Sequence, residues 1–98
     1  MSAVNIDTAL MLIKTRLNRM PKDTTLDMYF TARVQAAEQE LEATGIVLND
    51  TAADMMLVVD YTVWQYQNRD HERGMPDWLR LRRRERWLQQ RRPENESG

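Results

Sequence analysis

Apolar residues recur along the 98-residue chain at spacings of three and four, which is the period of helices with one buried face. The strict alternation of apolar and polar residues that is typical of strands is not found. Helices are predicted at about residues 7–18, 24–44, 51–69 and 76–91. We therefore predict an all-α fold, a small bundle of four helices in a single domain.

Proline, glycine and short polar side chains mark the predicted helix ends. Two threonine–aspartate pairs with the spacing of a capping pair predict where the second and third helices begin. These pairs are Thr24 with Asp27 and Thr51 with Asp54. Gly45 predicts a left-handed residue after the second helix, and Pro76 fits the first turn of the fourth helix. We expect the domain to cover residues 1–92 and a flexible C-terminal tail to follow at residues 93–98.

The third predicted helix is apolar on nearly all sides. One face carries Ala52, Met55, Met56, Val59, Val63 and Tyr66, and the other side carries Leu57, Tyr61 and Trp64. A helix with two apolar sides must be covered on both, so we expect the third helix to be long and central. The cover can come from the other helices of the same chain or from a neighbouring copy.

The second predicted helix is amphipathic. Its apolar face consists of Leu26, Phe30, Val34, Ala37 and Leu41. Asp27, Glu38 and Glu42 are expected on the opposite flank. We interpret this acidic flank either as a solvated surface or as a face that contacts another molecule.

Arginine dominates the fourth predicted helix. Residues 78–92 contain seven arginines and one glutamate, and the arginines are spread around the helix. The apolar residues that cluster on one side are Trp78, Leu81 and Leu88. We predict that this apolar side packs on the rest of the domain, whereas Leu79 and Trp87 contact another protein.

Arginine side chains can bury their alkyl stems while their guanidinium groups pair with carboxylates. We therefore predict that the fourth helix carries an interface with a neighbouring subunit or with another protein. The predicted interface residues are Arg80, Arg82, Arg83, Arg84, Arg86 and Trp87.

The net charge of −1 hides a difference between the two ends of the chain. Residues 1–68 carry five basic and nine acidic side chains, a net charge of −4. Residues 69–98 carry nine basic and six acidic side chains, a net charge of +3. Opposite charges at the two ends favour head-to-tail contacts between copies or contacts with a polar partner.

No catalytic or metal-binding group of residues stands out. Cysteine is absent, which excludes disulfides and thiolate sites, and the single histidine, His71, lies in a charged turn. The glycines at positions 45, 74 and 98 form no phosphate-binding loop. We expect no enzymatic activity, no cofactor and no metal. No apolar run exceeds five residues and no secretion signal opens the chain, so neither a membrane span nor secretion is expected.

The segment RLRRRERW combines arginine with an aromatic residue, as phosphate contacts and base stacking require. A small helical nucleic-acid-binding regulator that uses the fourth helix is therefore one interpretation. Against it, the arginines surround the helix and Glu85 interrupts them. The turn before the helix is also longer than that of a helix-turn-helix motif. We favour a protein partner.

Three segments of the chain form a recognisable set. The first is LDMYFTARVQAAEQELEATGIVL, which ends in an ATG corner. The second is MMLVVDYTVWQYQNRD, a long apolar helix that ends in a Tyr-x-x-Arg element at Tyr66 and Arg69. The third is MPDWLRLRRRERWL, a helix started by Pro76. Their order and spacing over roughly residues 7–90 resemble the small head–tail connector (adaptor) proteins of tailed bacteriophages, although the arginine run is denser than that pattern.

This resemblance implies a homo-oligomeric ring, usually dodecameric, beneath the portal protein in the neck of the virion. The ring extends the DNA channel and docks the stopper or tail-completion protein. DNA passes through it without specific binding, and no membrane is involved. Such proteins assemble in the host cytoplasm, have no catalytic residues and need no cofactor.

The resemblance also suggests roles for the candidate residues. The arginine interface on the fourth helix would meet the portal protein or the adjacent subunit. The acidic flank of Asp27, Glu38 and Glu42 would face either the DNA channel or the arginines of the next subunit. Tyr66 and Arg69 are expected to be structural, with the tyrosine ring packed at the helix end and the arginine holding the turn.

Overall fold

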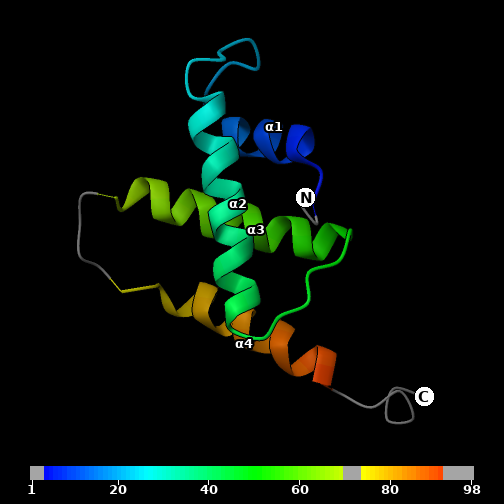
Figure 1. Cartoon of the computed structure of the whole chain (residues 1–98). Coiled ribbons are helices and arrows are strands. Elements are labelled where there is room, and N and C mark those ends of the chain that lie inside the picture. Colours follow the sequence, from blue (N-terminus) through cyan, green and yellow to red (C-terminus); the bar gives the residue numbers. More distant parts are fainter. Residues whose placement is uncertain (1–3, 70–73, 92–98) are drawn as a thin grey trace.

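The computed structural model describes residues 4–69 and 74–91, and these residues form four helices and no strand (Figure 1). The helices are α1 (Ile6–Arg16), α2 (Asp27–Ala43), α3 (Ala52–Gln67) and α4 (Asp77–Arg91). The predicted all-α bundle of four helices is therefore confirmed. His71 and the predicted tail at residues 93–98 lie outside the described residues.

One of the two predicted capping pairs is present. Thr51 accepts a hydrogen bond from the Asp54 amide at 3.2 Å and so caps the start of α3. Thr24 and Asp27 do not cap α2, which begins without a side-chain cap. Asp27 instead forms an ion pair with Lys14, and 2.9 Å separates Nζ from Oδ1. The capping prediction for Thr24 and Asp27 is therefore wrong: α2 begins at Asp27, whose carboxylate is held by a residue of α1.

Gly45 ends α2 in the left-handed conformation that the sequence predicts, with a φ of 98°. The Gly45 amide donates to the Glu42 carbonyl at 2.9 Å, and the Ile46 amide donates to the Leu41 carbonyl at 3.4 Å. These are the two hydrogen bonds of a Schellman motif. Ile46 and Leu41 are both buried, which adds the apolar contact that accompanies this motif.

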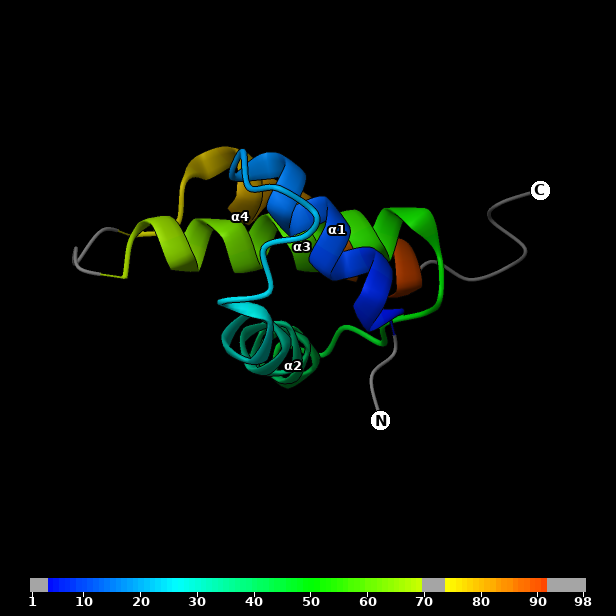
Figure 2. The same ribbon diagram turned by 90° about the horizontal axis from the view of Figure 1, so that it is seen from above.

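α3 is the central helix, as predicted. Each of the other three helices contacts it, and α4 runs alongside it in the opposite direction (Figures 1 and 2). The buried residues of α3 include Met55, Val59 and Val63 from one predicted face and Leu57 and Tyr61 from the other. Both apolar sides are covered within one chain, so α3 needs no cover from a second copy.

Tyr66 and Arg69 lie at the C-terminal end of α3. The Tyr66 ring packs edge-on against Phe30 of α2, with 5.2 Å between the ring centroids. The Arg69 guanidinium lies 4.2 Å from the centroid of the Tyr66 ring and donates a hydrogen bond to the Tyr66 carbonyl. The tyrosine thus joins α3 to α2, and the arginine braces the turn that follows.

Candidate interaction surface

α4 packs on the domain through a different side from the predicted one. Leu79 is 0% exposed, and Trp87 is partly buried against the core. Trp78, Leu81 and Leu88 are about half exposed, at 47%, 53% and 47%. The prediction that the Trp78 side docks on the domain, and that Leu79 faces another protein, is therefore wrong, whereas Trp87 packs partly on the core and also lines a surface cavity. The side that carries Leu79 faces the core, and the side that carries Trp78, Leu81 and Leu88 faces outward.

The inward side of α4 contains polar residues, which explains the error. Leu79, Arg86 and Gln90 follow one another at spacings of seven and four and so lie on one side of the helix. Pattern reasoning assigns Arg86 and Gln90 to solvent because long polar side chains are usually exposed. Here their polar ends reach α3 and the loop at residues 45–50, which joins α2 to α3.

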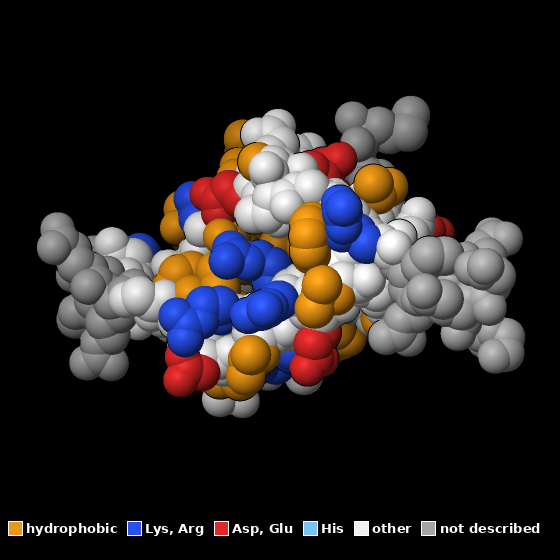
Figure 3. Space-filling model, turned by 90° about the horizontal axis from the view of Figure 1, so that it is seen from below, with side chains coloured by type: hydrophobic (Ala, Val, Ile, Leu, Met, Phe, Trp, Pro, Cys, Tyr) orange, Lys and Arg blue, Asp and Glu red, His pale blue; other side chains and the backbone are white. Residues whose placement is uncertain are grey.

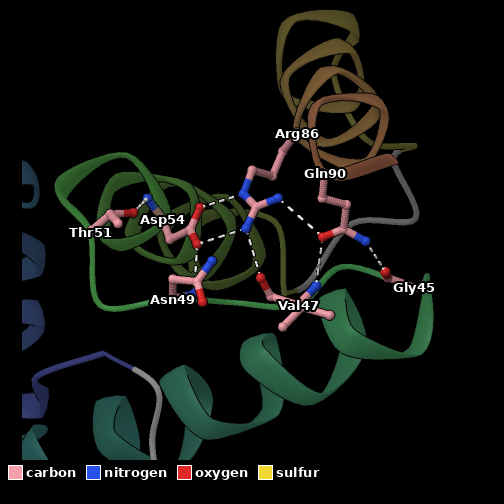
Figure 4. A network of polar contacts seen from close by, with 7 residues as sticks. All are labelled: Gly45, Val47, Asn49, Thr51, Asp54, Arg86 and Gln90. Atoms are coloured by element: carbon pink, nitrogen blue, oxygen red, sulfur yellow. Dashed lines mark hydrogen bonds and ion pairs between the residues drawn. The ribbon is translucent and has the colours of Figure 1, made fainter. Parts of the chain in front are cut away.

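Arg86 makes the main polar contact between α4 and the rest of the domain (Figure 4). Its Nε donates to Oδ1 of Asp54 at 2.7 Å, and its Nη2 donates to Oδ2 of the same carboxylate at 3.1 Å. The same Nη2 donates to the Val47 carbonyl at 2.7 Å. The Asp54 side chain is 2% exposed and the Arg86 side chain 14% exposed, so this bidentate pair is shielded from water.

Gln90 binds the loop at residues 45–50 to α4, beside Arg86 (Figure 4). Its Oε1 accepts from the Val47 amide at 2.8 Å and from Nη1 of Arg86 at 3.1 Å, and its Nε2 donates to the Gly45 carbonyl. The backbone amide of Asn49 donates to Oδ2 of Asp54 at 2.7 Å. The backbone of this loop is therefore hydrogen-bonded to side chains from both α3 and α4.

Two opposing effects act on the pKa of Asp54. Burial by itself raises the pKa of this carboxyl, because it disfavours the charged form. The hydrogen bonds from Arg86 and the Asn49 amide, with the positive charge of Arg86, outweigh burial, so the pKa of Asp54 lies below its ordinary value. The hydrogen bond to Asp54 in turn raises the pKa of Arg86. Both groups are therefore charged at neutral pH.

Asp60 of α3 binds a second arginine of α4. Its side chain is 5% exposed; Oδ2 accepts from Arg82 of α4, and Oδ1 accepts from Arg16 of α1. One buried carboxylate thus ties three helices together. Arg82 and Arg86, both predicted as interface residues, make these contacts within the chain.

The remaining predicted arginines line a surface cavity of about 290 Å³ between the end of α2 and α4. The cavity is lined by Thr44, Arg80, Leu81, Arg83, Arg84 and Trp87. We call Arg80, Arg83 and Arg84 the outer arginine cluster. Arg80 pairs with Asp77, whose side chain is 82% exposed. Arg83 and Arg84 form no ion pair with another described residue.

Figure 3 shows the face of the molecule that α4 occupies. Lysine and arginine side chains gather near the middle of this face, and hydrophobic side chains lie among them. Acidic side chains are fewer there and lie toward the margins. The face therefore combines positive charge with exposed apolar area.

The predicted acidic flank of α2 is not a single surface. Glu38 is 4% exposed, and its Oε2 accepts a hydrogen bond from the Val4 amide at 3.3 Å. Asp27 is bound to Lys14, and Glu42 is exposed. The prediction of a shared outer flank is wrong for Glu38, because the chain just before α1 packs over that part of α2.

The described residues contain no group of three histidine, cysteine, aspartate or glutamate side chains that could hold a metal ion. No helix among them is long and apolar enough to cross a membrane. Comparison of the chain with protein-family models, with curated proteins and with solved structures finds no match. The chemistry that the cavity offers is recognition of an anion by guanidinium groups beside an indole ring.

Proposed function

We propose that the chain is a structural head–tail connector (adaptor) of a tailed bacteriophage. In this role it forms a ring under the portal protein, extends the DNA channel and docks the stopper or tail-completion protein. It acts in the neck of the virion by shape and contact, without catalysis or a cofactor. The resemblance of three segments and the all-α fold both support this proposal.

The outer side of α4 is the observation that carries the proposal. Trp78, Leu81 and Leu88 are about half exposed, and they lie on the helix that carries the outer arginine cluster. Protein interfaces are enriched in aromatic residues and arginine near their centres, and such residues supply most of the binding energy. A surface of this composition suits a chain whose activity is to dock on other proteins.

A closed ring needs two different, complementary surfaces on every copy. The outer side of α4 supplies one surface with positive charge. Glu42 is the exposed member of the predicted acidic set. On our proposal it faces either the DNA channel or the arginines of the next subunit, and the outer arginine cluster meets the portal protein or that neighbour.

Affinity capture tests the proposed function. An N-terminally tagged chain is expressed in cells that produce the full set of phage proteins, and the lysate is treated with nuclease. We expect a portal-sized protein or complete particles in the eluate, identified by mass spectrometry. Nuclease-protected nucleic acid without any capsid protein would contradict the proposal.

A triple substitution to alanine at Arg80, Arg83 and Arg84 should abolish this capture while circular dichroism stays unchanged. Arg82 is left intact because it binds the buried Asp60. Lys22→Ala is the control, because it removes a positive charge from an exposed position outside α4. Loss of capture with Lys22→Ala as well would show that the effect is not specific to α4.

A nucleic-acid-binding regulator is the second candidate, because the three guanidinium groups at one cavity can also contact phosphates. This candidate predicts a steep salt dependence, in which log K falls by about 0.9 per phosphate contact for each tenfold rise in salt. A titration of the pure protein against duplex DNA at several salt concentrations separates the two functions.

A further inference from the structure

We propose that the cavity at the outer arginine cluster binds an acidic segment of a partner protein, in which carboxylates flank an apolar side chain. The carboxylates pair with Arg80, Arg83 and Arg84, and the apolar side chain rests against Leu81 and Trp87. The identity of the partner rests on the proposed function, since it is a protein of the same assembly. The chemistry of the site is argued from the cavity itself.

The first argument is the charge that lines the cavity. Its lining includes three guanidinium groups and no carboxylate. Only Arg80 has an acidic partner among the described residues, and that partner, Asp77, is 82% exposed and free to be displaced. A guanidinium forms two parallel hydrogen bonds with one carboxylate, and this arrangement is stronger where water is partly excluded.

The second argument is that one wall of the cavity is held in place before any partner binds. The indole of Trp87 lies over Gly45, so that a Cβ at position 45 would stand 2.9 Å from the indole Nε1. The guanidinium of Arg91 lies 4.7 Å from the centroid of the Trp87 ring. A wall that is fixed in advance loses little conformational entropy on binding, which favours affinity.

The third argument favours protein over nucleic acid. Trp78, Leu81 and Leu88 give the same helix exposed apolar area, which gains free energy when it is buried against apolar side chains but not against phosphates. The three arginines converge on one cavity instead of following a line of phosphates. The chain as a whole carries a net charge of −1, so it lacks the overall positive charge that is typical of nucleic-acid-binding domains.

The test uses nuclear magnetic resonance of the full chain labelled with ¹⁵N. The probe is a short blocked peptide in which glutamates flank leucine, and the matched control is the same peptide with glutamine in place of glutamate. The indole signal of Trp87 and the Nε–H signals of Arg83 and Arg84 report on the cavity. A short DNA duplex is titrated under the same conditions.

We expect the glutamate peptide to shift these signals and the glutamine peptide to leave them unchanged. R83A/R84A should weaken binding at least about tenfold, which is typical for loss of a central interface arginine. R83K/R84K keeps the charge but loses the two-pronged geometry, so it should bind with intermediate affinity. Lys22→Ala should bind as the unmodified chain does.

Several outcomes would overturn the inference. Equal shifts from the glutamate and glutamine peptides would show that carboxylates are not recognised. Tighter binding of the duplex than of the peptide would assign the cavity to nucleic acid. Signals that move with protein concentration alone, and that the peptide does not move further, would assign it to a second copy of the chain.

Failure of this inference can be distinguished from failure of the proposed function. If R83A/R84A no longer binds the peptide but is still captured with portal-sized protein or particles, the cavity is not the docking site and the connector function stands. If the unmodified chain binds the peptide but is never captured with capsid proteins, the cavity chemistry stands and the connector function fails.

Discussion

On its inner side α4 holds Arg86 against Asp54, whose side chain is 2% exposed, and on its outer side it holds Arg80 against Asp77, whose side chain is 82% exposed. Both are arginine–aspartate pairs whose arginine belongs to α4, but Asp54 lies on α3 and Asp77 on α4 itself. Breaking a pair around a buried carboxylate costs about 3–5 kcal/mol, whereas an exposed pair contributes about 0–1 kcal/mol. The burial of the carboxylate therefore decides whether an arginine of α4 holds the fold or remains available to a partner.

The apolar residues of α4 divide in the same way. Leu79 is 0% exposed within the core, and Leu81, two residues later, is 53% exposed beside the cavity. The inner side is thus a structural surface made of leucine, arginine and glutamine. The outer side combines arginine with leucine and tryptophan, and among the described residues its one acidic partner is the exposed Asp77. Substitutions in matched pairs can test this division directly.

The largest effect is expected for Leu79→Ala. Removing a fully buried leucine side chain should lower the free energy of unfolding by about 3–4 kcal/mol, because apolar burial is lost and a cavity remains. Leu81→Ala should change the same quantity by less than about 0.5 kcal/mol, since its side chain is already half in water. Urea denaturation followed by circular dichroism measures both. Equal losses for the two variants would mean that α4 is not seated as described.

Arg86→Ala should have the next largest effect. It leaves the buried Asp54 carboxylate without its cation, although the hydrogen bond from the Asn49 backbone amide remains. It should therefore lower the free energy of unfolding by about 2–3 kcal/mol, less than for a buried carboxylate that loses its only partner. Arg84→Ala, an exposed position on the same helix, should stay within about 0.5 kcal/mol of the unmodified chain. The same denaturation experiment applies. If Arg84→Ala proved as costly as Arg86→Ala, the assignment of Arg84 to the outer cluster would be untenable.

A smaller effect is expected at Gly45, where the loop at residues 45–50 contacts α4. Gly45→Ala places a Cβ at a φ of 98° and within 2.9 Å of the Trp87 indole, so it should cost about 1–2 kcal/mol. Gly74→Ala is the matched control, because a Cβ at position 74 meets nothing within 4 Å. Thermal unfolding of both variants should show a lower midpoint for Gly45→Ala only.

The sequence was sufficient for the four helices, for the central place of α3 and for the glycine that ends α2. These features depend on local signals: apolar periodicity, the Thr51 cap and the left-handed preference of glycine at position 45. The start of α2 was not predictable in this way, because Asp27 makes a tertiary ion pair with Lys14. Local capping rules do not include such distant partners.

The orientation of α4 could not be predicted from periodicity, since that method directs the most apolar side inward. The inner side holds Arg86, whose partner Asp54 lies 32 residues earlier in the chain. One signal was available: Asp54 and Asp60 are the only charged residues of the mostly apolar α3, and a buried carboxylate needs a cation. An arginine-rich helix that follows directly in the chain is the natural source of that cation.

The smallest effect is expected from pH, because the Asp54 carboxylate titrates well below neutrality. Its pKa in the folded chain lies below the value of about 3.9 for an unfolded aspartate. Its contribution to stability is therefore complete above about pH 4 and is lost as the pH falls through the folded pKa. The difference in unfolding free energy between the unmodified chain and Asp54→Asn should stay constant from about pH 8 to about pH 5 and shrink below about pH 4.

Asp77→Asn should show almost no difference at any of these pH values, as expected of an exposed pair. A difference for Asp54→Asn that stays the same in acid would show that the shape of this side chain, and not its charge, holds Arg86. The contrast between the two sides of α4 would then be one of packing alone.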